Sequence, residues 1–411
     1  MAKKILIISP VPLFPGHAGN RERIRAICVE LMSRGYLLDF FYTGFHQEVA
    51  EAHKSFFNGT VLKHALSREK VQWNRHPIYR AGEVLHGFKT TTDRWYRHFK
   101  EGPDSARFNK SLSEYKNFGK QILLEKQTTP ASYQAVIVNY APYSFYFDFF
   151  DKRTIKIIDT HDRLTDRFKL FSDNSQDPIN WHSLYREDEK RALAKADIVW
   201  AITDEEKEYF KKILRQTEIR IYTLRHLLPF EPTENRETFN TIVMIGSANR
   251  LNIDGLTWFL EQVWRKLTHY NFNLRFVIAG SICEVVDESI LDEQVELYGR
   301  FNSLQEIYSK GDLFINPMQE GTGLKIKTFE ALANGKTVLS TEAGATGLHE
   351  LIGNGLICSN DPAVWIREIK KFFEDGQKKK KDLKNADKII TQIYQENLGV
   401  IGKSLDIKKE I

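Results

Sequence analysis

The residues with the clearest capacity for chemistry lie in the stretch EGTGLKIKTFEALANGKTVLST, which runs from Glu320 to Thr341. Gly321 and Gly323 allow a backbone to approach a ligand closely, and the helix expected after them begins with unpaired N–H groups. Lys327 and Glu330 are three residues apart and therefore share one face of that helix. A cation at a helix N-terminus suits a diphosphate, and a carboxylate suits ribose hydroxyls. The pattern predicts a nucleotide-binding site.

The elements that must position this loop follow the alternation of an α/β protein. Short apolar runs alternate with amphipathic segments, which is typical of doubly wound parallel sheets. We expect strands at 4–9, 37–42, 135–139, 154–158, 197–202 and 220–224, and then at 242–245, 274–279, 295–298, 313–317 and 356–358. We expect helices at 20–34, 187–195, 255–267, 304–309 and 385–405, with a capping box of Thr203 and Glu206 at the start of another. The polar, proline-containing segment between the two sets is the expected linker.

Three segments carry a family resemblance. They are GSANRLNIDGLTWF at Gly246 to Phe259, VELYGRFNSLQEIYSKGDLFINP at Val295 to Pro317, and the glycine-loop stretch. Their order and spacing resemble the donor-binding half of GT-B glycosyltransferases of family four, the glycosyl transferases group 1. The resemblance covers most of residues 240–350 and extends more weakly to the N-terminus.

The resemblance implies a fold and an activity. The fold would be α/β of the GT-B type, with two doubly wound Rossmann-like domains facing each other across a cleft. Residues 1–225 would bind the acceptor, 226–240 would be the linker, 241–385 would bind the donor, and a helix at about 386–411 would pack back on the first domain. The enzyme would move a sugar from a nucleoside-diphosphate sugar to a glycan or lipid-linked acceptor in polysaccharide biosynthesis. Retention of anomeric configuration is expected, and neither a cofactor nor a metal is expected.

One departure from the family pattern leaves other functions open. Many members have two glutamates with seven residues between them, but here Thr322 stands at the position of the first, and Glu320 corresponds to it poorly. Lys327 and Glu330 match instead a branch with a lysine three residues before the glutamate. A non-catalytic nucleotide-sugar-binding partner in a glycan-assembly complex and a GT-B epimerase or phosphorylase therefore remain alternatives.

The candidate donor-binding residues come from three loops. Polar groups after the strand 242–245 suit phosphate oxygens, Arg300 follows the strand 295–298, and the remainder belong to the glycine loop and the helix after it. We expect Asn252 to cap a helix rather than to bind ligand. The candidates are Ser247, Asn249, Arg250, Arg300, Gly321, Thr322, Gly323, Leu324, Lys325, Lys327 and Glu330.

The candidate catalytic residues are His161 and Asp162, in the sequence THDR after the strand 154–158. Ligands of open α/β sheets bind at the carboxyl ends of strands. Similar enzymes have a histidine after this strand that contacts the donor sugar or helps to orient the reaction. Asp162 could orient His161 or bind a hydroxyl, whereas Arg163 and Arg167 either add positive charge or face solvent.

A second glycine loop precedes the first helix. Gly16, Gly19, Asn20 and Arg21 are the candidate acceptor-binding residues, although Asn20 is expected to cap the helix. The dinucleotide fingerprint G-x-G-x-x-G is absent from this loop, so a dinucleotide cofactor is not predicted.

Composition limits the remaining possibilities. The 411 residues are enough for two domains, and 42% hydrophobic with 27% charged residues indicates a globular chain. The three cysteines, Cys28, Cys283 and Cys358, are far apart and form no metal-binding pattern. No secretory signal or membrane-spanning run is evident. A reducing cytoplasm is the expected location, with association at the inner face of the membrane as a further option.

The segment 61–128 holds 14 lysines and arginines against 7 aspartates and glutamates, interleaved with aromatic residues such as Trp73, Trp95 and Phe99. One interpretation is a solvated helical excursion. A second is a surface for anionic lipid headgroups or a lipid-linked acceptor. A stacking platform for single-stranded nucleic acid is the weakest of the three, and no nucleic-acid partner is expected.

Overall fold

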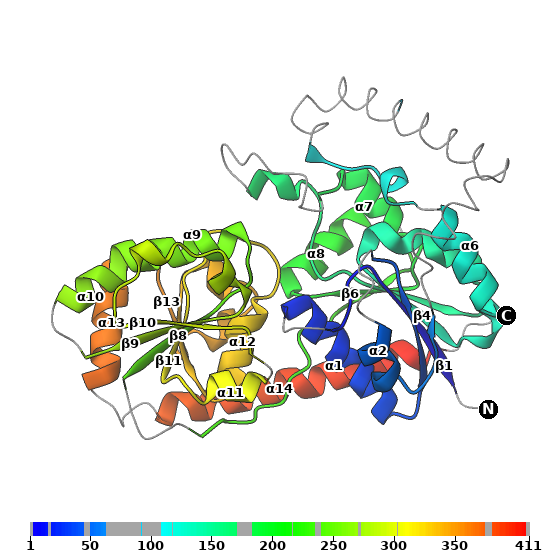
Figure 1. The fold of residues 1–411 in the computed structure, drawn as a ribbon. Coiled ribbons are helices and arrows are strands. Elements are labelled where there is room, and N and C mark those ends of the chain that lie inside the picture. The colour runs from blue at the N-terminus through cyan, green and yellow to red at the C-terminus, as the bar shows by residue number, and fades with distance from the viewer. Residues whose placement is uncertain are drawn as a thin grey trace. The chain divides into compact units, whose positions relative to one another are not determined.

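The computed structural model describes residues 3–14, 18–44, 50–62, 92, 108–116, 118–170, 183–215, 217–234, 240–269, 273–301, 303–374 and 380–407. Their contacts divide the chain into two compact units. The first unit comprises Met1–Pro15, Ile24–Leu224 and Val400–Ile411, and the second comprises Gly16–Arg23 and Arg225–Gly399. Each unit is an α/β assembly around one parallel sheet (Figure 1).

The first unit contains a seven-stranded sheet of order β3-β2-β1-β4-β5-β6-β7, in which every pair is parallel. Most positions in its central strands are apolar and buried, as is typical of a parallel sheet whose two faces are covered by helices. Phe41, Val138 and Ile158 belong to one core cluster on this sheet. The strands are β1 (Lys4–Ser9), β2 (Leu37–Tyr42), β3 (Val61–Leu62), β4 (Ala135–Asn139), β5 (Ile155–Asp159), β6 (Ile198–Ala201) and β7 (Arg220–Thr223).

Helices connect these strands. They are α1 (Gly19–Ser33), α2 (Ala50–Phe56), α6 (Phe118–Gln127), α7 (Arg186–Leu193) and α8 (Asp204–Ile213), with 3-10 turns at Leu112–Tyr115, Pro130–Ser132, Ala141–Phe149 and Arg167–Leu170. Thr203 caps α8 by accepting the N–H of Glu206 at 3.2 Å. The side chain of Glu206 accepts the N–H of Arg163 at 3.1 Å through Oε1. Glu206 therefore serves a neighbouring loop.

The second unit contains a six-stranded parallel sheet of order β10-β9-β8-β11-β12-β13 (Figure 1). Its core packs Phe259, Trp264 and Trp365 against the sheet residues Met244 and Phe276. The strands are β8 (Thr241–Ile245), β9 (Arg275–Ala279), β10 (Val295–Gly299), β11 (Leu313–Asn316), β12 (Thr337–Ser340) and β13 (Leu356–Cys358).

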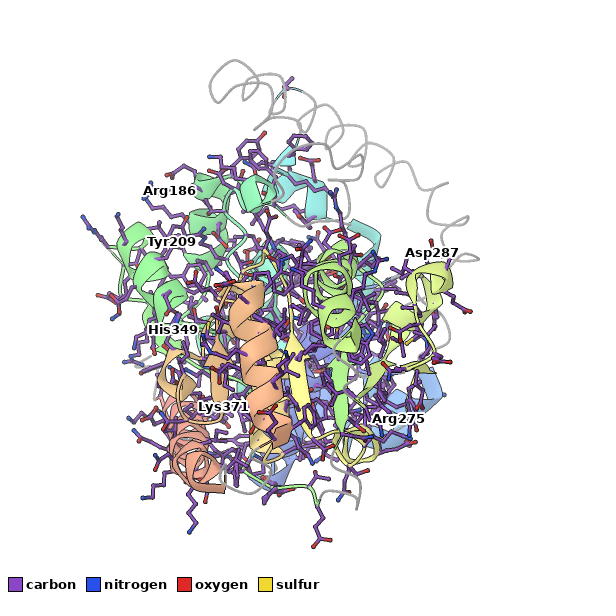
Figure 2. The ribbon with its side chains drawn as sticks, turned by 90° about the vertical axis from the view of Figure 1, so that its left-hand side faces the viewer. Arg186, Tyr209, Arg275, Asp287, His349 and Lys371 are labelled. Atoms are coloured by element: carbon purple, nitrogen blue, oxygen red, sulfur yellow. The ribbon has the colours of Figure 1, made fainter. Side chains whose placement is uncertain are left out.

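Its helices are α9 (Arg250–Phe259), a π-helical turn (Leu260–Trp264), α10 (Arg265–His269), α11 (Leu304–Tyr308), α12 (Ile326–Ala333), α13 (Pro362–Glu374) and α14 (Lys380–Leu405). Short 3-10 turns lie at Ser281–Glu284, Glu288–Ile290, Ala343–Ala345 and His349–Leu351. Asp287 and Lys371 are exposed on this unit, and both are labelled in Figure 2.

The strands expected from the sequence are present, four of them with the same bounds and the others shifted by a single residue at one or both ends. The helical stretch expected at 255–267 is longer, since α9, the π turn and α10 follow one another without a break. The last helix begins at Lys380, and its final residues group with the first unit. There Ser404 accepts a hydrogen bond from Trp200 Nε1 at 3.0 Å. Within the described ranges, no helix has both the length and the apolar composition to cross a membrane.

Candidate active site

The glycine loop of the second unit leaves β11 and enters α12. Gly321 has φ +144° and Gly323 has φ +70°, conformations that L-residues with a Cβ rarely adopt, so the loop depends on glycine at both positions. Lys325 lies at the N-cap of α12. Its ammonium folds back on the loop and donates to the carbonyl of Thr322 at 2.7 Å. Lys325 therefore closes the loop, and Leu324 beside it is buried.

Lys327 and Glu330 meet on one face of α12, as their spacing predicted. Lys327 Nζ donates to Glu330 Oε2 at 2.7 Å, and the lysine side chain is 23% exposed while the glutamate is 0% exposed. Tyr308, at the end of α11, donates its hydroxyl to the same oxygen at 3.3 Å. His226 places Nε2 3.6 Å from the other oxygen, Oε1. The carboxylate is thus an internal anchor, and the ammonium is the part of the pair that reaches solvent.

The charges in this cluster determine the ionisation of its members. Burial alone would raise the pKa of Glu330, but the nearby Lys327 and the contact with His226 outweigh burial and lower the pKa to about 2. Burial, together with the charge of Glu330, raises the pKa of Tyr308 well above its ordinary value. The cluster therefore contains an ionised carboxylate and a neutral phenol at neutral pH.

The first turn of α1 belongs to this unit and lies against the start of α12. A Cβ at Gly19 would come within 3.1 Å of Ile326 Cβ, so the beginnings of the two helices adjoin. The positive ends of two helix dipoles therefore converge here, which favours an anion. Asn20 was expected to cap α1, but the helix begins at Gly19 and the Asn20 side chain accepts the N–H of Arg21 at 2.9 Å. Gly16 lies outside the described residues.

The loop after β8 is organised by its own amides. Asn249 caps α9 by accepting the N–H of Asn252 at 3.0 Å, and it donates to Ser247 Oγ at 2.8 Å. The prediction that Asn252 caps this helix is wrong, because its side chain donates back to the carbonyl of Ser247 at 2.9 Å. Ser247, Asn249 and Asn252 thus form a connected polar loop.

Two arginines expected near the diphosphate have acidic partners. Arg250 contacts Asp254 one turn along α9 at 3.3 Å, with both side chains more than half exposed. Arg300 forms a two-point ion pair with Glu284, one contact being 3.0 Å between Nη2 and Glu284 Oε2. The pairing lowers the pKa of Glu284 and raises that of Arg300. A ligand phosphate would have to compete with these carboxylates.

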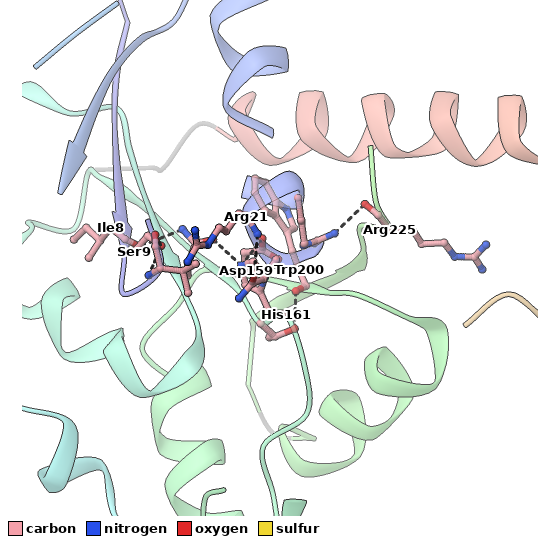
Figure 3. A network of polar contacts seen from close by, with 12 residues as sticks. Ile8, Ser9, Arg21, Asp159, His161, Trp200 and Arg225 are labelled. Carbon is pink, nitrogen blue, oxygen red and sulfur yellow. Dashed lines mark hydrogen bonds and ion pairs between the residues drawn. The ribbon is translucent and has the colours of Figure 1, made fainter. Parts of the chain in front are cut away.

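In the first unit, His161 follows β5 with φ +60° and is 8% exposed. Its Nε2 lies 2.8 Å from Asn139 Oδ1 and 3.3 Å from Asp159 Oδ2, and its ring stacks on Tyr140 with centroids 4.4 Å apart. Asn139 donates to the carbonyl of Ile8 at 3.1 Å, which turns its amide oxygen toward the imidazole. Asp159, His161 and Trp200 lie together at the ends of β5 and β6 (Figure 3).

The loop after His161 is held by two buried glutamates. Glu189 on α7 accepts the N–H groups of Leu164 at 2.8 Å and Thr165 at 3.0 Å, and also the Thr165 hydroxyl. Glu206 on α8 accepts the N–H of Arg163. Burial raises the pKa of Glu189 against these hydrogen bonds, and burial followed by the charge of Asp162 raises that of Glu206 well above its ordinary value.

Asp162 and the two arginines near it belong to the segment after His161 and make separate contacts. Asp162 Oδ2 contacts Arg167 Nη2 at 2.6 Å, and both side chains are largely buried. The guanidinium of Arg163 lies 4.8 Å from the ring centre of Tyr209. Within the described parts of the chain, no group of three or more His, Cys, Asp and Glu residues is arranged to hold a metal ion.

Comparisons with known proteins identify a matching family model and structures of similar fold. Residues 239–375 match the model of the family described as glycosyl transferases group 1. The matched residues lie within the second unit. Over their full lengths the two units have the α/β GT-B fold, as in TarM of S. aureus, which has a TM-score of 0.66 and 14% identity over 99% of each chain. The pneumococcal O-GlcNAc transferase GtfA, solved with UDP and GlcNAc, gives a TM-score of 0.65 at 10% identity over 99% of this chain and 100% of its own.

This chain is also similar to a curated relative, an uncharacterised protein in the cps region of Klebsiella pneumoniae. It is 28% identical over 153 residues, which is 35% of this chain. The match spans 39% of that relative's length.

The sequence did not point to several residues that contact Glu330 or the loop after His161. Tyr308 and His226 contact the carboxylate of Glu330 from distant segments, and Glu189 and Glu206 hold a loop that precedes them by some 25 to 43 positions. Asn139 had a detectable signal, since it is the last residue of a predicted strand. Most of the basic segment, residues 63–91 and 93–107, lies outside the described residues.

Proposed function

We propose that this protein is a glycosyltransferase that moves a sugar from a nucleoside-diphosphate sugar to a saccharide or lipid-linked saccharide. The proposal is carried by one observation: the glycine loop opens onto α12, where a partly exposed ammonium, that of Lys327, is held on a buried carboxylate, that of Glu330. The match of residues 239–375 to the group 1 family supports this assignment. The structures of similar fold that were solved with UDP support the choice of donor class.

The chemistry follows from where charge develops. Breaking the bond between the anomeric carbon and the diphosphate leaves negative charge on the leaving group. Lys327 and the adjoining starts of α1 and α12 supply positive potential for that charge. Glu330 keeps the ammonium in place rather than contacting the donor through its buried oxygens. We therefore propose that departure of the diphosphate is assisted by protein charge and does not need a divalent metal.

The second part of the proposal concerns His161. We assign it a contact with the donor sugar, because it is fixed by Asn139 and Tyr140 in a left-handed backbone conformation that is uncommon for residues other than glycine. Strain of this kind gathers at functional sites. Asp162, paired with Arg167, is assigned to the shaping of the same loop. Retention of anomeric configuration is the stereochemical outcome we propose.

The acceptor class is the least constrained part. The relative in a cps region favours a role in polysaccharide assembly. We propose a saccharide or lipid-linked saccharide acceptor that approaches the first turn of α1, where Gly19 lies next to α12 and Asn20 and Arg21 follow it in the helix. Association of the segment 61–128 with an anionic membrane remains part of the same proposal.

The test begins with the donor. Thermal shifts are measured with UDP, GDP, ADP, CDP and dTDP and their sugar conjugates, since a ligand that binds only the folded state raises its apparent stability. Lys327→Ala should weaken binding or turnover by about one to two orders of magnitude, because a charged hydrogen bond contributes roughly 1.5 to 3 kcal/mol. Lys371→Ala, on the exposed face of α13, is the matched control. Unchanged binding and rate in Lys327→Ala would refute the site.

Transfer is then measured with the stabilising donor and a panel of saccharide and lipid-linked acceptors, with and without EDTA. The anomeric configuration of the product is read by NMR. Binding with no transfer to any acceptor would favour the non-catalytic partner, for which Thr322 in place of a family glutamate leaves room. Consumption of donor without acceptor would favour an epimerase.

A further inference from the structure

His226 follows β7 by three residues and begins the segment that was expected to be only a linker. Its side chain is 2% exposed and belongs to the second unit. The edge of its ring meets Phe329 of α12, with centroids 6.3 Å apart and planes at 77°. Its Nε2 lies 3.6 Å from Glu330 Oε1. A connecting residue thus reaches the carboxylate that anchors Lys327.

The backbone around His226 is fixed by residues far away in the sequence. Asn397 of α14 accepts the N–H of Arg225 at 2.9 Å and donates to the carbonyl of His226 at 3.3 Å. The carbonyl of Arg225 accepts a hydrogen bond from Arg23 at 2.9 Å (Figure 3). Arg23 and Asn397 are both buried. The imidazole therefore projects from a backbone that has little freedom to move.

The two groups that face each other are each incompletely satisfied. Lys327 and Tyr308 both use Oε2 of Glu330, whereas Oε1 has no hydrogen-bond partner among the described residues. A separation of 3.6 Å is too long for a direct hydrogen bond, although a movement of a few tenths of an ångström would form one. A buried carboxylate oxygen without a partner costs free energy, so this contact is favourable to complete.

We propose that His226 is a positioning residue of the donor site: its Nε2–H donates to Oε1 of Glu330, which leaves Oε2 to hold the ammonium of Lys327 toward the diphosphate. This role rests on the proposed function. Asn397 holds the backbone of His226, His226 contacts the carboxylate of Glu330, and Glu330 holds the partly exposed ammonium of Lys327. His226 itself does not touch the donor in this proposal.

The experiment is a double-mutant cycle read by calorimetric binding of UDP, GDP, ADP, CDP and dTDP to the full chain. His226→Leu should lower the affinity for the preferred nucleoside diphosphate by about tenfold or more, because a hydrogen bond to a charged group is lost. His226→Gln, whose amide nitrogen can stand where Nε2 stood, should retain most of the affinity. In a Glu330→Gln background, His226→Leu should cause little further loss. His349→Leu, on an exposed 3-10 turn of the same unit, is the control.

The outcomes separate the two levels of the proposal. Wild-type protein that binds none of the five nucleotides would overturn the proposed function, and the role of His226 with it. Wild-type protein that binds, alongside a His226→Leu variant of equal affinity, would overturn only the role of His226. An equal loss in both backgrounds, or no rescue by His226→Gln, would show that the residue supports the fold and does not position Glu330. Thermal unfolding of each variant identifies any that fail to fold, and His226→Gln then carries the comparison.

Discussion

Glu206 in the first unit and Glu330 in the second are both shielded from solvent, yet their pKa values are displaced in opposite directions. Burial raises the pKa of Glu206, and the charge of Asp162 raises it further. The same burial at Glu330 is outweighed by Lys327 and His226, and its pKa falls to about 2. The sign of the neighbouring charge, rather than the depth of burial, decides whether the carboxyl is ionised.

The difference matches two ways of building a polar loop at the end of a parallel strand. The His161 loop is held by carboxyl groups that accept backbone N–H groups, so its order depends on hydrogen bonds to Glu189 and Glu206. The glycine loop of the second unit leads instead to a charged pair, in which a buried anion presents a cation. The first arrangement fixes the shape of a loop, and the second presents a partly exposed positive charge.

The largest effect is expected from Glu189→Ala, which should break the first arrangement. The variant leaves the N–H groups of Leu164 and Thr165 buried without partners, at about 1 to 3 kcal/mol each. We expect the free energy of unfolding to fall by roughly 3 to 5 kcal/mol, and the transfer rate to fall with the loss of order around His161. Denaturant unfolding and steady-state kinetics measure the two effects.

Glu187→Ala is the matched control, because Glu187 lies exposed on the same turn of α7. It should change the free energy of unfolding by no more than about 0.5 kcal/mol. A Glu189→Ala protein as stable as this control would show that the hydrogen bonds to the loop contribute little.

The pH dependence of stability should separate the two glutamates. The folded pKa of Glu330 is about 2, against 4.5 for the ordinary side chain, so its contribution is complete above the ordinary value and is lost as pH falls toward 2. At neutral pH this contribution is roughly 3 kcal/mol. Glu206 has a raised folded pKa, so its contribution is present below 4.5 and is lost as pH rises through the folded value.

Each contribution is measured as the difference in unfolding free energy between wild type and a glutamine variant. The advantage of wild type over Glu330→Gln should shrink between about pH 5 and about pH 3. The free energy of unfolding of wild type should instead fall relative to that of Glu206→Gln as pH rises above about 5. Slopes of the same sign for both variants would contradict the comparison.

Lys327→Met tests the second arrangement, the charged pair of Lys327 and Glu330, and should have a somewhat smaller effect on stability. It removes the cation and leaves the buried charge of Glu330 with less compensation, so the free energy of unfolding should fall by about 1.5 to 3 kcal/mol. The pKa of Glu330 should rise in the variant, and adding Glu330→Gln should restore much of the stability. Lys371→Met is the surface control. If the double variant were no more stable than Lys327→Met, Glu330 would not be the anion that needs this cation.

The sequence predicted the parts of this molecule that depend on local pattern. Buried strands such as β1 and β4 are continuous apolar runs, and Lys327 and Glu330 meet because a helix brings positions three apart together. The ion pair of Arg250 with Asp254 has the i, i+4 spacing and was also open to prediction.

The remaining contacts depend on tertiary structure. Arg300 meets Glu284 from a neighbouring segment, and His226 meets Glu330 from more than 100 residues away. A capping pattern identified Thr203 and Glu206, but it could not show that the carboxylate of Glu206 accepts an N–H from the His161 loop. Sequence spacing shows which residues share an element; the partner of a buried polar group is decided by the fold.

The smallest expected effect concerns Asn249, which the sequence suggested as a phosphate ligand. Its side chain already caps α9 and donates to Ser247 Oγ, so both ends of the amide are engaged. Asn249→Ala should cost about 1 kcal/mol of stability through the lost cap, and Asn249→Asp should restore most of that loss because aspartate caps as well as asparagine. The affinity of Asn249→Asp for a nucleoside diphosphate, measured by calorimetry, then distinguishes the roles: a cap alone leaves the affinity close to that of wild type. If Asn249 binds a phosphate, the negative charge of Asn249→Asp should instead lower the affinity strongly. That result would place a second part of the diphosphate site in the loop before α9.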